Sequence, residues 1–372
     1  MGQDQAKGKV GIREYVAVIM LTVGVKLSDD TPAILVEHLK NAYWMVPFVT
    51  GIILFIPTFL LVKVITAHQN KKNLYDLFIH LFGKYIGTSL SLFLCIGLFT
   101  EISTDSGIYV DIISTMYFTN TPPLIIYIVL ISVSAYGAKK GIQHIGSVSW
   151  LVLFYIKATL ILALLLALRN STTSFLFPLL GPGGLDIVKQ SYSHVSLFGE
   201  YLFIGLLAPF LTSSKAFKRG TFISYCVILI EMGISFIVYL CLFDYEPLQT
   251  LNYPYHELIR IISIGFLTNI ETFFFPIWLL AAFIRFSFYF FIMALFFGAI
   301  FKIKNYEDLI PTFAALAIII GMFPETPTFT IYQFKDSLLH AFSPFYLLLP
   351  CLMWIIAKIK GDFKNDKNIK SS

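Results

Sequence analysis

Two interruptions in long apolar stretches constrain this chain more than any other feature of its sequence. Residues 24–32 read GVKLSDDTP and place one Lys, two Asp and a Pro inside an apolar segment. Residues 197–201 read LFGEY, so that a glycine and a carboxylate open another apolar helix. Within a bilayer, backbone groups freed from a helix are tolerated only where they are buried in protein or line a cavity. Matched breaks in two halves of a chain point to a binding site near the membrane midplane.

The composition predicts an integral membrane protein. Of the 372 residues, 57% are hydrophobic and 13% are charged, whereas a soluble domain carries roughly 25% charged residues. No polar stretch is longer than a loop or a short tail, and the first apolar run does not end in a signal-peptide cleavage site. We therefore expect a single transmembrane domain over residues 1–372, with the lipid bilayer as its main surroundings.

The chain lacks the motifs of the common enzyme and cofactor sites. Its four cysteines lie inside apolar segments and its seven histidines are scattered as single residues. There is no H-E-x-x-H, C-x-x-C, Walker loop or G-x-S-x-G. The sequence therefore predicts no enzymatic activity, no cofactor, no metal site and no nucleic-acid partner.

Apolar runs of about 20 residues are long enough to span a membrane, and the sequence predicts ten of them. The fold class expected is an all-α membrane protein, built as a five-plus-five inverted repeat with halves at about 12–168 and 196–359. Helices 1 and 6 would be the broken ones. The predicted spans are 12–35, 43–64, 85–117, 122–136, 142–168, 196–211, 217–243, 270–301, 309–323 and 338–359, with short amphipathic helices at 74–82, 185–193 and 256–264.

The distribution of Lys and Arg predicts the orientation. Most basic residues fall in one set of alternate loops, and these loops are cytoplasmic by the positive-inside rule. Both termini are therefore predicted to be cytoplasmic. The opposite, outer set of loops holds only Lys40, Arg169, Lys189, Arg260 and Lys335.

Basic residues remain inside the predicted spans, at a cost of at least ~2.5–3.5 kcal/mol each near the bilayer centre. Lys26, in the first break, either contacts a ligand or forms a structural ion pair with Glu101 or Glu200. Lys157 either pairs with a carboxylate of another span or serves as a coupling site that exchanges protons. Arg285 either faces a cavity or snorkels toward the interface.

Some acidic residues have a simpler interpretation. Asp30, Asp111 and Glu231 lie near the ends of their predicted spans, where a carboxylate can reach the headgroup region. We interpret them as interfacial.

The chain resembles the B subunit of GerA-type spore germinant receptors, within the amino acid–polyamine–organocation transporter superfamily. The resemblance covers essentially the whole chain. Each motif is weak alone, and their order and spacing make the match. They are FGKYIG at 82–87, FPLLGPG at 177–183, SLFGE at 196–200, IETF at 270–273 followed by Ile277-Trp278, and Phe323-Pro324.

The resemblance implies a ten-span fold in the spore inner membrane, in complex with a larger membrane subunit and a lipoprotein subunit. It also implies that a small nutrient, typically an amino acid, binds between spans 1, 3, 6 and 8. The ligand contacts carried over to this sequence are Gly24, Val25, Gly97, Glu101, Leu197, Phe198, Gly199, Ile284 and Ser287; the breaks themselves add Lys26 and Glu200.

Two departures from the family pattern concern the predicted pocket. Lys26 stands where the family has the second glycine of its first break, and Glu101 stands where an apolar residue is usual. These charges leave the identity of the ligand open. The leading hypothesis is a nutrient-sensing subunit. The alternatives are a secondary transporter of amino acids or cations, which could be proton-coupled through Lys157, and a scaffold subunit with a non-binding pocket.

Overall fold

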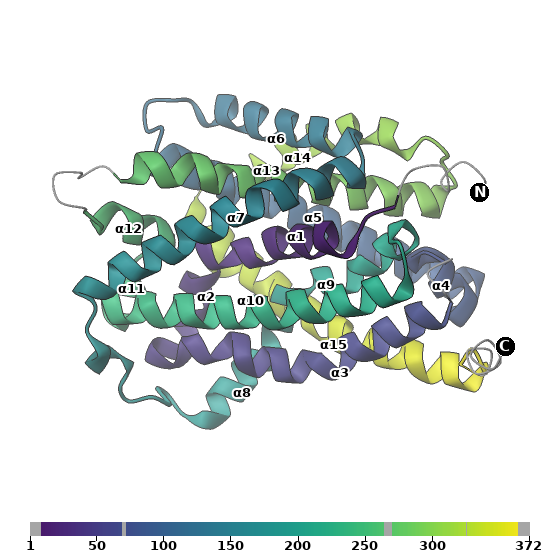
Figure 1. The fold of residues 1–372 in the computed structure, drawn as a ribbon, viewed down its shortest axis with the longest axis horizontal. Helices are drawn as coiled ribbons and strands as arrows, with labels where there is room; N and C mark the ends of the chain where they lie inside the picture. Colours follow the sequence, from purple (N-terminus) through teal and green to yellow (C-terminus); the bar gives the residue numbers. More distant parts are fainter. Residues whose placement is uncertain (1–8, 69–71, 264–269, 325, 364–372) are drawn as a thin grey trace.

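The computed structural model describes residues 9–68, 72–263, 270–324 and 326–363, and nearly all of their regular structure is helical. The long helices lie along a common direction and form one bundle (Figure 1). Within the described residues the single β-type pairing is a bridge between Val10 and Leu211. An all-helical bundle is expected for a membrane protein because each helix satisfies its own backbone hydrogen bonds.

The helices of the first half follow the predicted segments closely. Asn73 caps one of them by accepting a hydrogen bond from Asp76 N at 2.8 Å. Gly83 and Gly141, with φ of 82° and 83°, allow the sharp turns before the next two. The helices are α1 (Ile12–Thr22), α2 (Thr31–Leu39), α3 (Val46–Ala67), α4 (Leu74–Phe82), α5 (Lys84–Met116), α6 (Pro123–Lys139) and α7 (Ile142–Ala167).

The second half contains a larger share of irregular helix. The tenth predicted span begins earlier than expected, because a π-helical turn, η9 (Phe329–Lys335), runs directly into its helix. The α-helices are α8 (Gly184–Ser193), α9 (Glu200–Phe203), α10 (Ser214–Phe243), α11 (Tyr245–Leu248), α12 (Pro254–Ile261), α13 (Glu271–Phe301), α14 (Ile310–Gly321) and α15 (Asp336–Ile359). The 3₁₀ segments that matter for the site are η2 (Gly24–Ser28), η6 (Val195–Phe198) and η7 (Ile204–Phe210).

Among the described residues, six helical segments are long and apolar enough to cross a membrane by length and composition. The other predicted spans are helical but shorter or interrupted. For example, α1 has 11 residues and α14 has 12, fewer than the roughly 20 that a full crossing needs. The protein is therefore an integral membrane protein with all-α architecture, and the ten-span inverted repeat stays a prediction. The candidate spans are Thr31–Ala67, Lys84–Met116, Ile142–Asn170, Ser214–Phe243, Glu271–Phe301 and Phe329–Ile359.

The helix α13 forms the centre of the bundle. It contacts α1, α5, α6 and α7, and its aromatic residues Phe286, Phe288 and Phe290 are fully buried. By contrast, α7 leaves apolar side chains such as Phe154 exposed at 75%. A helix that is apolar and largely buried is a core helix, so Arg285 in the middle of α13, which is 0% exposed, lies in the protein interior rather than in lipid.

The first and last described helices meet at the same end of the bundle. In Figure 1, α1 starts at the end where α15 finishes, and α11 and α12 lie at the opposite end. Each break lies in a buried part of the bundle, since the residues of η2 and η6 are all buried.

Candidate functional site

The first break is a local unwinding between α1 and α2. Helix α1 ends at Thr22, and the chain then makes five residues of 3₁₀ helix. Asp29 restarts the helix, because its Oδ1 accepts a hydrogen bond from Thr31 N at 2.8 Å, and Pro32 occupies the first turn of α2, where its missing N–H costs nothing. The sequence SDDTP thus acts as a helix start.

Side chains from distant helices satisfy the carbonyl groups that the first break frees. Arg285 Nη1 donates to Thr22 O at 2.5 Å, and Tyr239 Oη donates to Leu27 O at 3.1 Å. Ser28 Oγ donates to Val25 O at 2.6 Å. Buried backbone carbonyls need such partners, so part of the role of Arg285 is to hold the unwound segment together.

Lys26 joins the two breaks. Its Nζ donates to Leu197 O in η6 at 2.7 Å, lies 2.7 Å from Glu200 Oε1 and 3.4 Å from Glu101 Oε1. Both carboxylates expected as possible partners of Lys26 thus lie beside it, and ligand contact by Lys26 stays a prediction. Tyr289 Oη donates to Glu200 Oε1 at 2.7 Å, so α13 also reaches the junction. Lys26 is 2% exposed, which places the junction deep inside the bundle.

The ion pairs continue from Lys26 through the centre of the bundle. Arg285 pairs with Asp105 and lies 3.9 Å from Glu200 Oε1. Lys335 Nζ lies 2.6 Å from Asp30 Oδ1 and 3.0 Å from Asp105 Oδ1. We refer to Lys26, Asp29, Asp30, Glu101, Asp105, Glu200, Arg285 and Lys335 as the central charge cluster.

Two interpretations from the sequence are wrong here. Asp30 is not interfacial and Lys335 is not in an outer loop, since both are buried and pair with each other. The reason is structural: Asp30 lies in the unwound segment, and η9 extends the last long helix so that Lys335 points into the bundle. Arg285, left open between a cavity and the interface, is fully buried.

The central charge cluster holds more carboxylates than cations. Three of its carboxylate oxygens, Asp29 Oδ2, Asp30 Oδ2 and Glu200 Oε2, are buried and accept no hydrogen bond from the described residues. Burying unpaired charge is costly, and oxygens of this kind are satisfied by a proton, by water or by a donor group of a ligand. The cluster therefore favours a group that donates hydrogen bonds or carries positive charge.

A pocket opens beside the cluster. Its cavity volume is about 40 Å³, which is room for a few waters and less than the ~300–1,000 Å³ of a typical small-molecule site, so a nutrient would have to widen it. Four predicted contact residues line it, namely Lys26, Gly97, Glu101 and Leu197. Thr104, Asp105 and Ser196 add to the same sides, and the remaining wall comes from η9 and α15 through Lys335, Leu338, Leu339, Phe342 and Tyr346. The structure thus brings spans 1, 3, 6 and 10 around this pocket, where the resemblance implied spans 1, 3, 6 and 8.

Other predicted residues lie around a second pocket. Gly24 and Val25 line it with Lys157 and Glu231, and its cavity volume is about 30 Å³. Lys157 pairs with Glu231, so Lys157 does pair with a carboxylate of another span. The interfacial interpretation of Glu231 is wrong, because its side chain is 11% exposed and faces α7. Asp111, the third residue interpreted as interfacial, is half-buried, and its Oδ2 accepts a hydrogen bond from Tyr253 Oη at 2.5 Å.

The last predicted contacts line neither of these two pockets. Phe198 and Ile284 are buried, and Ser287 Oγ donates to Ser134 O in α6 at 2.9 Å. At Gly199, an added Cβ would lie 2.6 Å from the ring of Tyr346, so this glycine permits close packing. Ligand contact by these four residues stays a prediction.

Several members of the cluster were not predicted as site residues. The sequence pattern could have predicted Asp105, because Gly97, Glu101 and Asp105 are spaced by four residues and share one face of α5. Tyr289 follows Arg285 by the same spacing. No sequence pattern could have predicted Lys335, because its partners are far away in the sequence.

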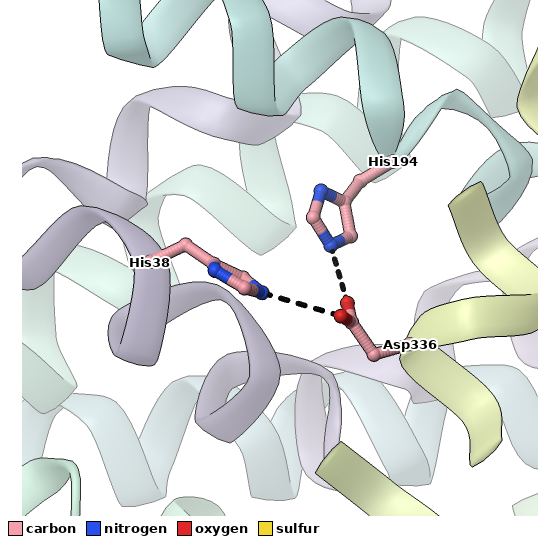
Figure 2. A group of neighbouring side chains, drawn as sticks. All are labelled: His38, His194 and Asp336. Atoms are coloured by element: carbon pink, nitrogen blue, oxygen red, sulfur yellow. Dashed lines mark hydrogen bonds and ion pairs between the residues drawn. The ribbon is translucent and has the colours of Figure 1, made fainter. Parts of the chain in front are cut away.

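The fold also gathers histidines that the sequence scatters, although the sequence predicted no metal site. His38, His194 and Asp336 come from three different segments and converge (Figure 2). A second group is formed by His68, His80 and Asp362. In both groups the ligand atoms lie within 4.8 Å of one another.

Comparison with known proteins identifies the family. The family model described as spore germination protein matches residues 14–330, which is most of the chain. The chain belongs to the spore germination protein family.

Its curated relatives are remote in sequence and similar in length. Spore germination protein B2 of Bacillus subtilis (strain 168) is 20% identical over 328 residues, covering 85% of this chain and 86% of the relative. Spore germination protein KB of the same strain is 23% identical over 260 residues, covering 66% and 68%. The resemblance seen in the sequence motifs is therefore confirmed.

Proposed function

We propose that this spore germination family member is a non-enzymatic nutrient-sensing subunit of a germinant receptor in the spore inner membrane. A small nutrient would bind in the pocket lined by Lys26, Gly97, Glu101 and Leu197. Binding would shift the broken helices between two states, which requires that the nutrient favour one of them. The larger membrane subunit and the lipoprotein subunit would receive the signal.

The observation that carries this proposal is the direct contact between the two breaks. Lys26 Nζ in η2 donates to Leu197 O in η6 and pairs with Glu200 at the start of α9, and both Lys26 and Leu197 line the pocket. A ligand there would touch both interrupted helices at once. Such a site can couple occupancy to their relative position.

The charge of the site supports an amine-containing nutrient. The central charge cluster has more carboxylates than cations, with buried unpaired oxygens. An ammonium group would supply both positive charge and donors. Amino acids carry such a group, and their carboxylate could approach Lys26 or Lys335.

Filling the pocket tests the proposal. Leu338→Trp places an indole in the pocket from α15, and Leu348→Trp makes the same change at a position of α15 that is 59% exposed. In spores lacking the native gene, the wild type and Leu348→Trp should restore germination to single L-amino acids, and Leu338→Trp should not. Normal germination with Leu338→Trp at normal protein level would instead indicate a scaffold whose pocket is not used.

Flux measurements separate sensing from transport. Proteoliposomes containing this chain alone are expected to take up no radiolabelled L-amino acid above the level of empty vesicles. Saturable uptake that depends on a proton gradient would contradict the pure sensor. If uptake were lost in Lys157→Met, the coupling role of the Lys157–Glu231 pair would be supported.

A further inference from the structure

The histidine group in Figure 2 has the composition and geometry of a metal site. His38 lies in the last turn of α2, His194 lies between α8 and η6, and Asp336 begins α15. His194 Nε2 lies 2.9 Å from Asp336 Oδ1, and His38 Nε2 lies 3.4 Å from Asp336 Oδ2. Both imidazole rings therefore direct the same nitrogen at one carboxylate.

The hydrogen bonds of His194 fix which nitrogen carries its proton. Its Nδ1 lies 2.8 Å from Gln190 O, and a carbonyl oxygen can only accept, so Nδ1 is the donor. In the neutral ring, Nε2 then presents a lone pair to an acceptor oxygen of Asp336. Two acceptors at this distance repel each other unless a proton or a metal cation lies between them. A backbone carbonyl on the far nitrogen is also the usual support of a metal-binding histidine.

The spacing suits a tetrahedral ion. Zinc binds His nitrogen and Asp oxygen at about 2.0–2.2 Å, so two ligand atoms of a tetrahedral site lie roughly 3.3 Å apart. The two distances to Asp336, 2.9 and 3.4 Å, lie on either side of this value. His340 is a further neighbour, because its ring centroid is 4.7 Å from that of His194.

The surroundings of this group favour a cation more than those of the second group. The side chain of His194 is fully buried and that of Asp336 is 16% exposed, and the adjacent Lys335 has its charge matched by Asp30 and Asp105. At the other group, Lys360 Nζ donates to the backbone oxygen of His80 at 2.5 Å, which brings positive charge to that site.

We propose that His38, His194 and Asp336 bind one divalent transition-metal ion of the zinc class, with the fourth position left for water or His340. The ion would tie α2, the start of η6 and the start of α15 together. This site lies next to the proposed nutrient pocket, since Lys335 and Leu338 on either side of Asp336 line that pocket. None of the three proposed ligands lines the pocket, and the metal proposal does not depend on nutrient binding.

The test is isothermal titration calorimetry, in which Zn²⁺ is added to the purified full chain in detergent. We expect saturable binding that falls at least tenfold in His38→Asn and in Asp336→Asn. His38→Cys replaces one zinc ligand by another and should restore binding, which shows that the loss is not caused by misfolding. His144→Asn is the matched control. His144 is exposed, and its Nδ1 also forms a hydrogen bond with a backbone oxygen, that of Lys140.

Three outcomes would overturn the proposal. The first is no saturable Zn²⁺ binding, which would leave a protonated histidine paired with Asp336. The second is binding that His38→Asn and Asp336→Asn leave unchanged. The third is binding that is lost only in His68→Asn, which would place the ion at the second histidine group.

Discussion

At the scale of single residues, the central charge cluster has a structural role that holds with or without a ligand. Arg285 and Lys26 satisfy carbonyl groups of the two unwound segments as well as pairing with carboxylates. Removing one partner of a buried ion pair costs more stability than replacing both partners by apolar residues, because the remaining charge stays buried without compensation. The charges that depart from the family pattern are therefore part of the packing of this chain.

Lys26→Met is predicted to destabilise the protein by about 3–5 kcal/mol, because Glu200 and Glu101 lose their counter-charge. The double variant Lys26→Met/Glu200→Gln should recover a large part of this loss. Thermal unfolding in detergent is the measurement. Arg260→Gln is the control, since its pair with Glu257 is half-exposed, and it should change stability by less than about 0.5 kcal/mol. Equal effects of the two single substitutions would contradict the account.

At the scale of elements, close helix crossings depend on small residues. An added Cβ at Gly107 in α5 would lie 2.8 Å from the backbone oxygen of Gly321 in α14. Backbone cannot move aside as a flexible side chain can, so the two helices would have to separate. Small residues at such crossings are typical of membrane helix packing.

Gly107→Ala is therefore predicted to destabilise the bundle by about 1–3 kcal/mol, the usual range for overpacking. The matched control is Gly184→Ala, because nothing lies within 4 Å of its added Cβ and it begins α8. Unfolding midpoints in detergent compare the two. A Gly107→Ala protein as stable as Gly184→Ala would show that the α5–α14 crossing is looser than described.

The short helix α12 lies outside the six candidate spans and contacts the first break. Burial lowers the pKa of His256 to about 3, and Tyr117 Oη lies 2.7 Å from its Nδ1. The folded state thus keeps His256 neutral while the unfolded chain protonates it near its ordinary pKa of about 6.5. The unfolded state binds more protons below this value, so stability falls as the pH drops.

The expected result is a loss of stability that grows as the pH decreases from about 6.5 toward 3. His256→Gln should show a flatter dependence over this range, whereas His144→Gln, at an exposed position, should follow the wild type. Unfolding midpoints measured at a series of pH values provide the test. Parallel curves for wild type and His256→Gln would contradict a buried neutral His256.

At the scale of the whole molecule, the sequence predicted the features that depend on local pattern. Apolar runs predicted where the helices lie, the GVKLSDDTP and LFGEY stretches predicted the breaks, and the charge of Lys26 predicted its carboxylate partners. The position of Lys335 against Asp30 could not be predicted, because the pair joins residues 305 apart in the sequence. It depends on where η9 lies relative to the first break, which no local pattern encodes. The same holds for His38, His194 and Asp336.

The central claim is that the pocket beside Lys26 binds the nutrient. The most direct test is binding of single L-amino acids to the purified full chain, compared between wild type, Leu338→Trp and Leu348→Trp. An amino acid that binds the wild type should bind Leu348→Trp within about twofold and Leu338→Trp at least tenfold more weakly, about 1.4 kcal/mol. Equal affinity of Leu338→Trp and the wild type would contradict the account and place the ligand elsewhere in the molecule.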